Sequence, residues 1–379
     1  MHNPKIIFDL IRSHDINLFT GVPDSLLKDF CAFVTDSTSK EQHIIAANEG
    51  NAIAIAAGHY LGTGQPALVY MQNSGIGNAV NPLLSLADSE VYSLPMLLMI
   101  GWRGEPGVID EPQHLKQGRI MTTLMDALEI PWYKLSSDTE RPSDVIDKAI
   151  TQMKDIKAPV ALLVSKGTFK KYILKQDNTA KFQMSREQAI KNIVKHLNES
   201  DLIVSTTGMT SRELYEHRAQ AKQGHSNDFL TVGSMGHTAS IALGLAQTQI
   251  DRKIFCIDGD GSVLMHMGAL GVLGSSGTKN IIHIVINNGV HDSVGGQPTV
   301  GFDIDLPEIA KSCNYAHVFS IEDKENLSKC LSNVQQLQGP IFIEIKVQKG
   351  ARDNLGRPKS TPIENKSALM SLIGNQNDR

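Results

Sequence analysis

Short apolar stretches rich in β-branched residues alternate along this chain with longer segments of helical periodicity. The N-terminal half contains such stretches at residues 16–21, 43–48, 66–72, 95–102 and 159–165. The C-terminal half contains a second set at residues 202–208, 229–234, 253–259, 280–287 and 340–347. Nearly continuous apolar strands that alternate with helices are typical of parallel sheets with helices on both faces. The pattern therefore predicts an α/β protein with two doubly wound parallel-sheet domains.

A polar, lysine-rich segment without clear periodicity separates the two sets of strands. Segments of this kind commonly connect compact domains, and a length of 379 residues suits two of them. After Gly350 the pattern becomes irregular and ends in one short helical stretch. The expected organisation is an N-terminal domain at 1–166, a linker at 167–184, a C-terminal domain at 185–350 and a tail at 351–379.

Composition narrows the class of protein. A net charge of −4, with 20% charged residues, gives no reason to expect nucleic acid or an anionic membrane as a partner. The four cysteines lie far apart and form no C-x-x-C motif, which favours a reducing compartment over a zinc site or a disulfide framework. No apolar run approaches the roughly 20 residues that span a bilayer, and the acidic Asp9 is unlike a signal peptide. We therefore expect a cytoplasmic protein.

The segment CIDGDGSVLMHMGALGVLGSSGTKNIIHIVINN places polar residues at the ends of two consecutive apolar strands. Asp260 follows the first strand, and Asn287 ends the second. If one helix connects two parallel strands, both side chains reach the same edge of the sheet. These two oxygen ligands, together with the Gly289 carbonyl, would hold Mg²⁺ and leave its remaining positions to diphosphate oxygens and water.

The turn around Asp260 is also suited to a phosphate group. Gly259 and Gly261 allow backbone N–H groups to approach a ligand closely, and Ser262 is expected to open a helix whose N-terminus favours an anion. Either motif alone is compatible with an ordinary turn between a strand and a helix, whereas the two together favour a binding site. A dinucleotide-binding fold is the other alternative, but G-x-G-x-x-G is absent from the first turn of either half.

The pattern GDGS…INN resembles the cofactor-binding motif of thiamine-diphosphate (TPP) enzymes. This resemblance implies that the C-terminal domain binds the diphosphate, with Gly259, Gly261 and Ser262 beside it. A TPP enzyme also needs a carboxyl group hydrogen-bonded to the pyrimidine ring of the cofactor. The segment AANEGNAIAIAAGHYLGTG resembles the motif that carries this acid, so Glu49 is the expected activating residue and the N-terminal domain the pyrimidine-binding one. Otherwise Glu49 would be a first-turn glutamate favoured by the helix dipole.

The segment GSMGHTASIALGLA resembles another part of the cofactor site. By this resemblance the Gly233 carbonyl would accept a hydrogen bond from the pyrimidine amino group, and Met235 would support the bent form of the cofactor. Ordinary core packing is the alternative role for Met235. Many relatives carry a third domain between the two, and this chain has only the short linker. In the family the cofactor lies between domains of different subunits, so a homodimer or higher homo-oligomer is implied.

Longer segments narrow the resemblance further. FTGVPDSLL, EPQHLKQG, GSMGHTASIALGLA and NNGVHDSVGGQPT resemble the phosphonopyruvate decarboxylase family, with sulfopyruvate decarboxylases as close relatives. The resemblance implies decarboxylation of 3-phosphonopyruvate to phosphonoacetaldehyde and CO₂, in 2-aminoethylphosphonate biosynthesis. Fusion of both domains in one chain favours the phosphonate substrate, because sulfopyruvate decarboxylases commonly divide them between subunits. Unlike pyruvate decarboxylases, the chain contains no His-His pair.

Such a substrate carries a carboxylate and a phosphonate, so its site needs hydrogen-bond donors and cations. The candidates follow predicted strands or lie in loops that resemble active-site loops of related decarboxylases. They are Asp24, Ser25, Gln72, Asn73, His114, Lys116, Arg119, His291, Ser293 and Gln297. Each is also a residue type common in exposed polar loops. The role of Asp258, beside the metal loop, stays open.

Three alternatives remain at this point. The substrate could be sulfopyruvate or another 2-keto acid. The chain could be a non-catalytic TPP-fold regulatory subunit, although Glu49, Asp260 and Asn287 are all present, whereas such chains usually lose the acid or a metal ligand. A carboligase that forms acetolactate-like products is the third, and the missing middle domain argues against it.

Overall fold

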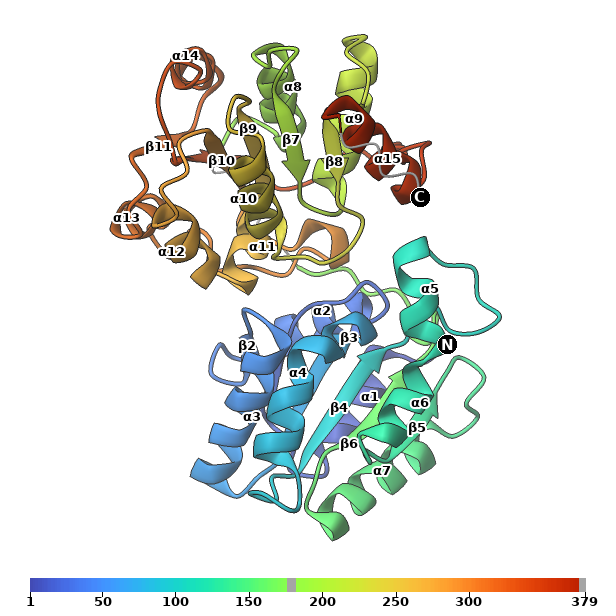
Figure 1. The fold of residues 1–379 in the computed structure, drawn as a ribbon. Coiled ribbons are helices and arrows are strands. Elements are labelled where there is room, and N and C mark those ends of the chain that lie inside the picture. Colours follow the sequence, from blue (N-terminus) through green and yellow to red (C-terminus); the bar gives the residue numbers. More distant parts are fainter. Residues whose placement is uncertain (176–181, 375–379) are drawn as a thin grey trace. The chain divides into compact units, whose positions relative to one another are not determined.

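A computed structural model describes residues 1–175 and 182–374. The chain divides into two compact units, one made of residues 1–177 and 293–298 and the other of residues 178–292 and 299–379. Residues 176–181 of the predicted linker and 375–379 of the predicted tail lie outside the described residues. Each unit contains a six-stranded sheet in which all described pairs are parallel (Figure 1).

The first unit has the strand order β2-β1-β3-β4-β6-β5. Its strands are β1 (Phe19–Gly21), β2 (His43–Ile45), β3 (Ala67–Gln72), β4 (Met96–Gly101), β5 (Trp132–Leu135) and β6 (Val160–Val164). Apolar residues on both faces of this sheet form separate cores with the helices that cover them. One face carries α1 (Pro4–Arg12), α2 (Lys28–Ser37) and α7 (Pro142–Ile156). The other carries α3 (Glu49–Thr63), α4 (Ile76–Pro82) and α6 (Met121–Ala127).

The second unit repeats this plan with the order β11-β12-β10-β9-β7-β8. Its strands are β7 (Leu202–Ser205), β8 (Asp228–Leu230), β9 (Ile254–Gly259), β10 (Ile281–Asn287), β11 (His317–Ile321) and β12 (Ile341–Lys346). One face packs against α8 (Arg186–Lys195), α9 (Met209–Gln220) and α14 (Lys324–Val334). The other packs against α10 (Thr238–Thr248), α12 (Gly268–Gly274), α13 (Leu306–Ser312) and α15 (Pro362–Leu372).

Further helical segments lie mainly where strands end or helices continue. They are α5 (Pro112–Arg119), α11 (Asp260–Met265), η1 (Asn73–Gly75), η2 (Leu83–Ala87) and η3 (Asp292–Val294). Across residues 1–175 and 182–374, no helix combines the length and apolar character that a membrane crossing requires.

The predicted α/β fold with two doubly wound parallel sheets is confirmed, and the described residues contain no third sheet between the two. The apolar pattern did not predict β5 and β11, which are edge strands, one in each sheet. Both are only partly buried along most of their length. An edge strand buries less of its surface, so it lacks the continuous apolar run that marks the central strands.

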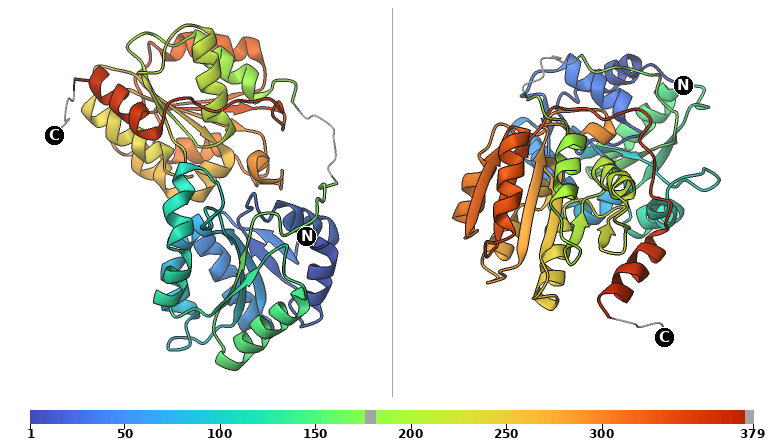
Figure 2. Two further views of the ribbon diagram at one scale, coloured as in Figure 1. Left: turned by 90° about the vertical axis from the view of Figure 1, so that its right-hand side faces the viewer. Right: turned by 90° about the horizontal axis from the view of Figure 1, so that it is seen from above.

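The final helix α15 lies beside the edge strand β8 (Figures 1 and 2). Its buried Asn365 accepts a hydrogen bond from the Leu230 N–H at 3.0 Å and donates to the Asp228 carbonyl at 2.8 Å. The Asn365 amide therefore satisfies backbone groups that an edge strand would otherwise leave unpaired.

Candidate functional site

Two side-chain oxygens converge where strands β9 and β10 end. The register pairs Gly259 with Ile286, so the next residues, Asp260 and Asn287, reach the same edge of the sheet. Both side chains are buried. A Cβ atom on Gly301 would stand 2.7 Å from Asn287 Oδ1 and 2.8 Å from Asp260 Oδ2. Because Gly301 has no side chain, there is room beside both oxygens, and this arrangement fits a small hard cation.

The orientation of the Asn287 amide follows from its other partners. Its Nδ2 donates to the Gly301 carbonyl at 2.6 Å and to Glu344 Oε1 at 2.8 Å. Glu344 is itself buried, and its second oxygen accepts a hydrogen bond from Ser320 Oγ at 2.9 Å. The nitrogen must face these acceptors, so Oδ1 is the atom that faces the space beside Asp260. Glu344 therefore orients a metal-type ligand without occupying the same space.

Asp260 lies in an environment that a cation would complete. Burial raises the pKa of its carboxyl to about 6, although hydrogen bonds from the Thr299 hydroxyl and from backbone N–H groups lower it. A divalent ion at this place would favour the charged carboxylate. The Gly289 carbonyl, the third predicted ligand, accepts a hydrogen bond from the Thr299 N–H at 2.9 Å. A carbonyl oxygen has two lone pairs, so this bond leaves one for a metal.

Gly261 is needed because side chains pack closely against its Cα. A Cβ there would lie 3.0 Å from His291 Cε1 and 3.3 Å from Met235 Cε, tighter than ordinary contact. The half-buried Met235 is thereby placed beside the turn that carries Asp260. Burial lowers the pKa of His291 to about 4, so its ring is neutral at physiological pH.

Ser262 connects the turn to two other loops. Its Oγ accepts hydrogen bonds from the Gly236 N–H at 3.0 Å and from Thr206 Oγ1 at 3.2 Å. Gly233, the predicted acceptor for the pyrimidine amino group, is half-buried in the same loop as Gly236. Helix α11 begins at Asp260, earlier than the expected start at Ser262. Ser262 therefore fixes the loop of Gly233 relative to the helix that opens at Asp260.

In the first unit, Glu49 is held at the start of α3. The Asn48 side chain caps this helix by accepting a hydrogen bond from the Asn51 N–H. Glu49 is buried, and its Oε2 accepts from Asn78 Nδ2 at 2.7 Å. A Cβ on Gly75 would collide with Glu49 Oε1. Burial raises the pKa of the Glu49 carboxyl, and the hydrogen bond from Asn78 opposes this shift.

Three predicted substrate residues belong to one hydrogen-bonded cluster at the carboxyl edge of the first sheet. Arg103, which the sequence did not single out, lies at its centre. Its Nη1 donates to Ser25 Oγ at 2.6 Å, its Nε donates to Asp110 Oδ2 at 2.7 Å, and its Nη2 donates to Asp110 Oδ1. Asp110 Oδ1 also lies 2.9 Å from His114 Nδ1. His114 Nε2 lies 3.5 Å from Gln72 Nε2.

Two further candidates support this cluster. The buried Asn73 uses both ends of its amide on the Arg103 backbone: it donates to the carbonyl at 2.9 Å and accepts from the N–H at 3.1 Å. Asp24 is 1% exposed, and within the described chain its Oδ1 has no hydrogen-bond partner. Burial raises the pKa of Asp24 to about 6, against the opposing effects of the Leu26 N–H and of the Arg103 charge.

The remaining candidates are not part of this cluster. Lys116 and Arg119 are exposed on α5, whereas His114 on the same helix is buried. Ser293 is exposed. Gln297 is fully buried, belongs by its contacts to the first unit, and donates to the Lys28 carbonyl at 3.5 Å. Their roles in substrate binding stay predictions.

Comparison with known proteins places this chain in a family. The N-terminal TPP-binding domain of thiamine pyrophosphate enzymes matches residues 1–126, and the C-terminal TPP-binding domain matches residues 206–345. Phosphonopyruvate decarboxylase from Streptomyces viridochromogenes is 33% identical over 364 residues, which cover 92% of this chain and 89% of that protein. This chain belongs to the phosphonopyruvate decarboxylase family. A second member, from Streptomyces hygroscopicus, is 31% identical over 364 residues, covering 92% and 88%.

The phosphonopyruvate decarboxylase family is thus the one predicted from the motifs, and that prediction is confirmed. Domain fusion is weaker support for it: separate subunits of a sulfopyruvate decarboxylase from Methanocaldococcus jannaschii each match part of this chain, but one sulfopyruvate relative does not divide the domains. A protein named sulfopyruvate decarboxylase, from Methanosarcina acetivorans, is 25% identical over 367 residues, which cover 91% of each chain. It matches both domains in a single chain, so fusion of the domains does not separate the two kinds of enzyme.

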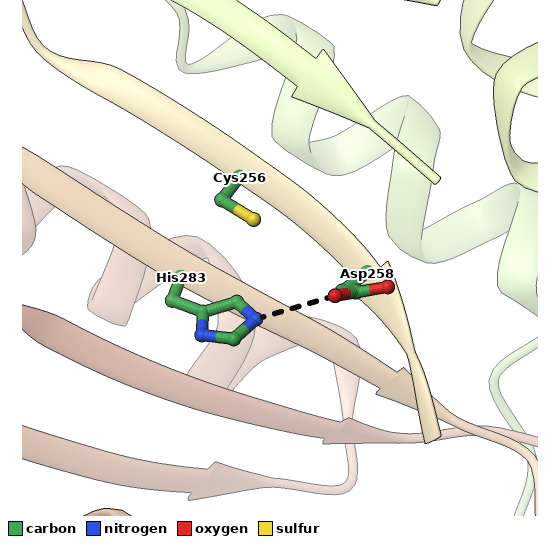
Figure 3. A group of neighbouring side chains, drawn as sticks. All are labelled: Cys256, Asp258 and His283. Carbon is green, nitrogen blue, oxygen red and sulfur yellow. Dashed lines mark ion pairs between the residues drawn. The ribbon is translucent and has the colours of Figure 1, made fainter. Parts of the chain in front are cut away.

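A second polar cluster lies in the sheet interior, next to the strand end of the predicted metal site. Figure 3 shows Cys256 and Asp258 on β9 and His283 on β10, all buried, with ligand-type atoms within 4.8 Å of one another. Asp258 Oδ1 accepts from the Gly259 N–H at 3.0 Å, and Oδ2 lies 3.7 Å from His283 Nε2, too far for a hydrogen bond. Burial raises the pKa of Cys256 well above its usual value, so the thiol stays protonated. His283 pairs instead with Tyr315 OH at 3.0 Å. Asp258 therefore faces His283.

The sequence did not point to four residues that shape the Asp260–Asn287 site and the Arg103 cluster. They are Arg103, Asp110, Gly301 and Glu344. A charged residue within the apolar stretch IFIEIKV was a usable signal for Glu344, because a buried carboxylate needs partners. The other three lie in loops, and their partners are distant in sequence.

Proposed function

We propose that this chain decarboxylates 3-phosphonopyruvate to phosphonoacetaldehyde and CO₂, with thiamine pyrophosphate and Mg²⁺ as cofactors. The relatives named for this activity are similar along nearly the full chain, at 33% and 31% identity against 25% for the sulfopyruvate enzyme. The observation that supports cofactor binding most directly is the convergence of Asp260 and Asn287 on the space that Gly301 leaves open. Released aldehyde would be consumed in phosphonate biosynthesis.

In this proposal the second unit holds the metal and the diphosphate. Asp260, the Asn287 side-chain oxygen and the Gly289 carbonyl would bind Mg²⁺, with diphosphate oxygens completing its coordination. Gly259, Gly261 and Ser262 would lie beside the diphosphate, where the N–H groups of the turn can donate to it. Glu344 fixes which end of the Asn287 amide faces the metal.

The first unit would supply Glu49, the carboxyl group that acts on the pyrimidine ring of the cofactor. When bound, thiamine pyrophosphate supplies an electron sink for the negative charge that develops as CO₂ leaves. Glu49 would hydrogen-bond to the pyrimidine ring and hold a proton there, a role for which its raised pKa and its fixed position against Asn78 are suited. The Gly233 carbonyl and Met235 would orient the cofactor. We also propose a homodimer or higher homo-oligomer in which, as in related enzymes, two subunits share each cofactor.

The test is aldehyde release by the purified protein with thiamine pyrophosphate and Mg²⁺. Phosphonopyruvate, sulfopyruvate and pyruvate are compared at equal concentrations. We expect phosphonopyruvate to be preferred by at least about tenfold, which corresponds to about 1.4 kcal/mol of transition-state binding. A preference for sulfopyruvate would instead favour the second candidate, which the Methanosarcina relative supports. Cofactor binding without turnover of any of the three would contradict an enzymatic role.

A further inference from the structure

We propose that Arg103 binds the phosphonate group of the substrate and that Asp110 holds its guanidinium in place for that purpose. This inference rests on the proposed function and identifies the cation that the charged end of the substrate requires. The sequence directed attention to Lys116 and Arg119 for this role.

The backbone of Arg103 is fixed at the carboxyl edge of the first sheet. Arg103 lies two residues beyond the end of β4, and Asn73 directly follows the neighbouring β3. The two hydrogen bonds between the Asn73 amide and the Arg103 backbone join these strand ends, at 2.9 and 3.1 Å. Ligands of open parallel α/β sheets bind outside the carboxyl ends of the strands. The position of Arg103 is therefore that of a ligand-binding residue, on a loop with little freedom.

The side chain of Arg103 is held as firmly as its backbone. Asp110 accepts from Nε and Nη2 in a bidentate pair, and its two oxygens also accept from the N–H groups of Gly104 at 2.9 Å and Glu111 at 2.7 Å. Burial raises the pKa of Asp110, but the hydrogen bonds from Arg103, His114 and these N–H groups outweigh burial and hold it far below its usual value. Asp110 is thus a permanent anion that sets the plane of the guanidinium.

Arg103 keeps capacity for a ligand. Three of its five N–H groups are used in the bonds to Asp110 and Ser25 that the described residues make. One N–H on each Nη remains, which matches the paired oxygens of a phosphonate. The Arg103 side chain is 19% exposed, whereas that of Asp110 is only 7% exposed. The Asp110 carboxylate that holds Arg103 is therefore inside the protein, and the guanidinium is the part that reaches the surface of the unit.

His114 can add a further donor. Its Nδ1 faces the Asp110 carboxylate, which can only accept, so Nδ1 carries the proton. Nε2 is then the variable atom, close to Gln72. A phosphonate dianion nearby would favour a proton on Nε2, because an opposite charge stabilises the imidazolium. Ser25, Gln72 and His114 would then surround an anion that Arg103 binds.

A purely structural ion pair is the alternative to a binding site. Buried ion pairs are often no more stabilising than apolar side chains of similar size, so stability alone does not account for this one. The exposed Lys116 and Arg119 lie on α5 but are not held by any comparable network among residues 1–175. An anion site with a fixed orientation requires the pre-organised cation rather than a mobile one.

The experiment compares Arg103→Met and Arg103→Lys with the wild-type enzyme, using Arg141→Met as matched control because Arg141 is 80% exposed in the same unit. We expect Arg103→Met to lower kcat/KM for phosphonopyruvate by about a hundredfold or more. The value for pyruvate, which lacks the phosphonate, should change less than about threefold, since only the lost bonds to phosphonate carry the effect. Arg103→Lys keeps the charge without the paired geometry, so it should restore part of the loss.

A binding measurement keeps the inference testable apart from turnover. Calorimetric titration of the cofactor-loaded protein with phosphonoacetate should show weaker binding in Arg103→Met and no change in Arg141→Met. If the wild type turns over no phosphonopyruvate, the proposed function fails, while this titration still tests Arg103. Equal losses for pyruvate and phosphonopyruvate would overturn the inference and assign Arg103 to the shared carboxylate. A loss confined to Arg119→Met would overturn it in favour of α5.

Discussion

The two units share one scaffold and differ in what they place at its edge. Starting from β2 in one sheet and β8 in the other, the strand orders are the same, with β9 in the place of β3 and β10 in the place of β4. In the second unit Asp260 follows β9 and Asn287 ends β10, and the oxygens of these two side chains converge. In the first unit Asn73 follows β3 and Arg103 lies two residues beyond β4, and these two residues are hydrogen-bonded to each other.

This difference shows how chemistry is distributed on a repeated fold. Equivalent strand ends offer oxygens suited to a cation in one unit and N–H donors suited to an anion in the other. The sheets position the loops, and a few loop residues decide whether an edge is suited to a cation or to an anion. The units also share a buried carboxyl with a pKa near 6: Asp260 lies against a second ligand-type oxygen, and Asp24 lies near Arg103.

The largest expected effect concerns the cation side. Asp260→Ala should abolish metal-dependent binding of thiamine pyrophosphate, because it removes the charged one of the two converging oxygens. Calorimetric titration of the cofactor at increasing Mg²⁺ measures this directly. The exposed Asp251 of the same unit provides a control, since Asp251→Ala should bind normally. Unchanged affinity in Asp260→Ala would remove Asp260 from the metal site.

The next largest effect is expected at Glu49, the acid proposed to activate the cofactor. Glu49→Gln should lower kcat by about a hundredfold to ten-thousandfold while cofactor affinity stays within a few-fold, since the amide keeps the shape but cannot exchange a proton. Steady-state kinetics and the same titration separate the two effects. Full activity in this variant would show that Glu49 does not activate the cofactor.

A smaller effect is expected at Glu344, which contacts a ligand of the proposed metal site and not the site itself. Glu344→Gln should weaken Mg²⁺-dependent cofactor binding by about 10- to 100-fold, because a glutamine can turn its own donor toward Asn287 and release the amide. A Mg²⁺ titration of cofactor binding reports this loss without any turnover. If the variant binds Mg²⁺ as the wild type does, Gly301 alone is sufficient to orient Asn287.

The smallest expected effect is on the pH dependence of stability, and it comes from Asp24, the buried carboxyl of the first unit. Asp24 has a pKa of about 6 when folded against 3.8 for an ordinary aspartate. A raised acid pKa stabilises the fold at low pH, and this contribution is lost as pH rises through about 6. An asparagine does not titrate, so Asp24→Asn does not lose stability in this way. The free energy of unfolding of the variant minus that of the wild type should therefore rise by about 1 to 2 kcal/mol from pH 5 to pH 8. Urea unfolding of both proteins at both pH values measures this difference. A difference that does not change with pH would place the Asp24 charge in contact with water.

Local signals made much of this protein predictable. The central strands are continuous apolar runs, and GDG and NN end two of them, so the edge with Asp260 and Asn287 followed from sequence order. Glu49 stood out at the start of an alanine-rich helix. The edge strands β5 and β11 were missed because partial burial leaves a mixed pattern. Lys116 and Arg119 attracted attention through their proximity to His114 in sequence, yet α5 buries only His114.

By itself the sequence determined the periodic features: two parallel sheets, the strand ends that carry ligands, and the family whose motifs those ends match. Periodicity and spacing are local, and the rules that connect consecutive parallel strands turn them into a sheet edge. Only the tertiary structure decided which end of Asn287 faces the space beside Asp260, that Gly301 keeps that space open, and that Asp110 and Ser25 fix Arg103. Those features depend on hydrogen bonds between residues far apart in sequence, for which no spacing rule exists.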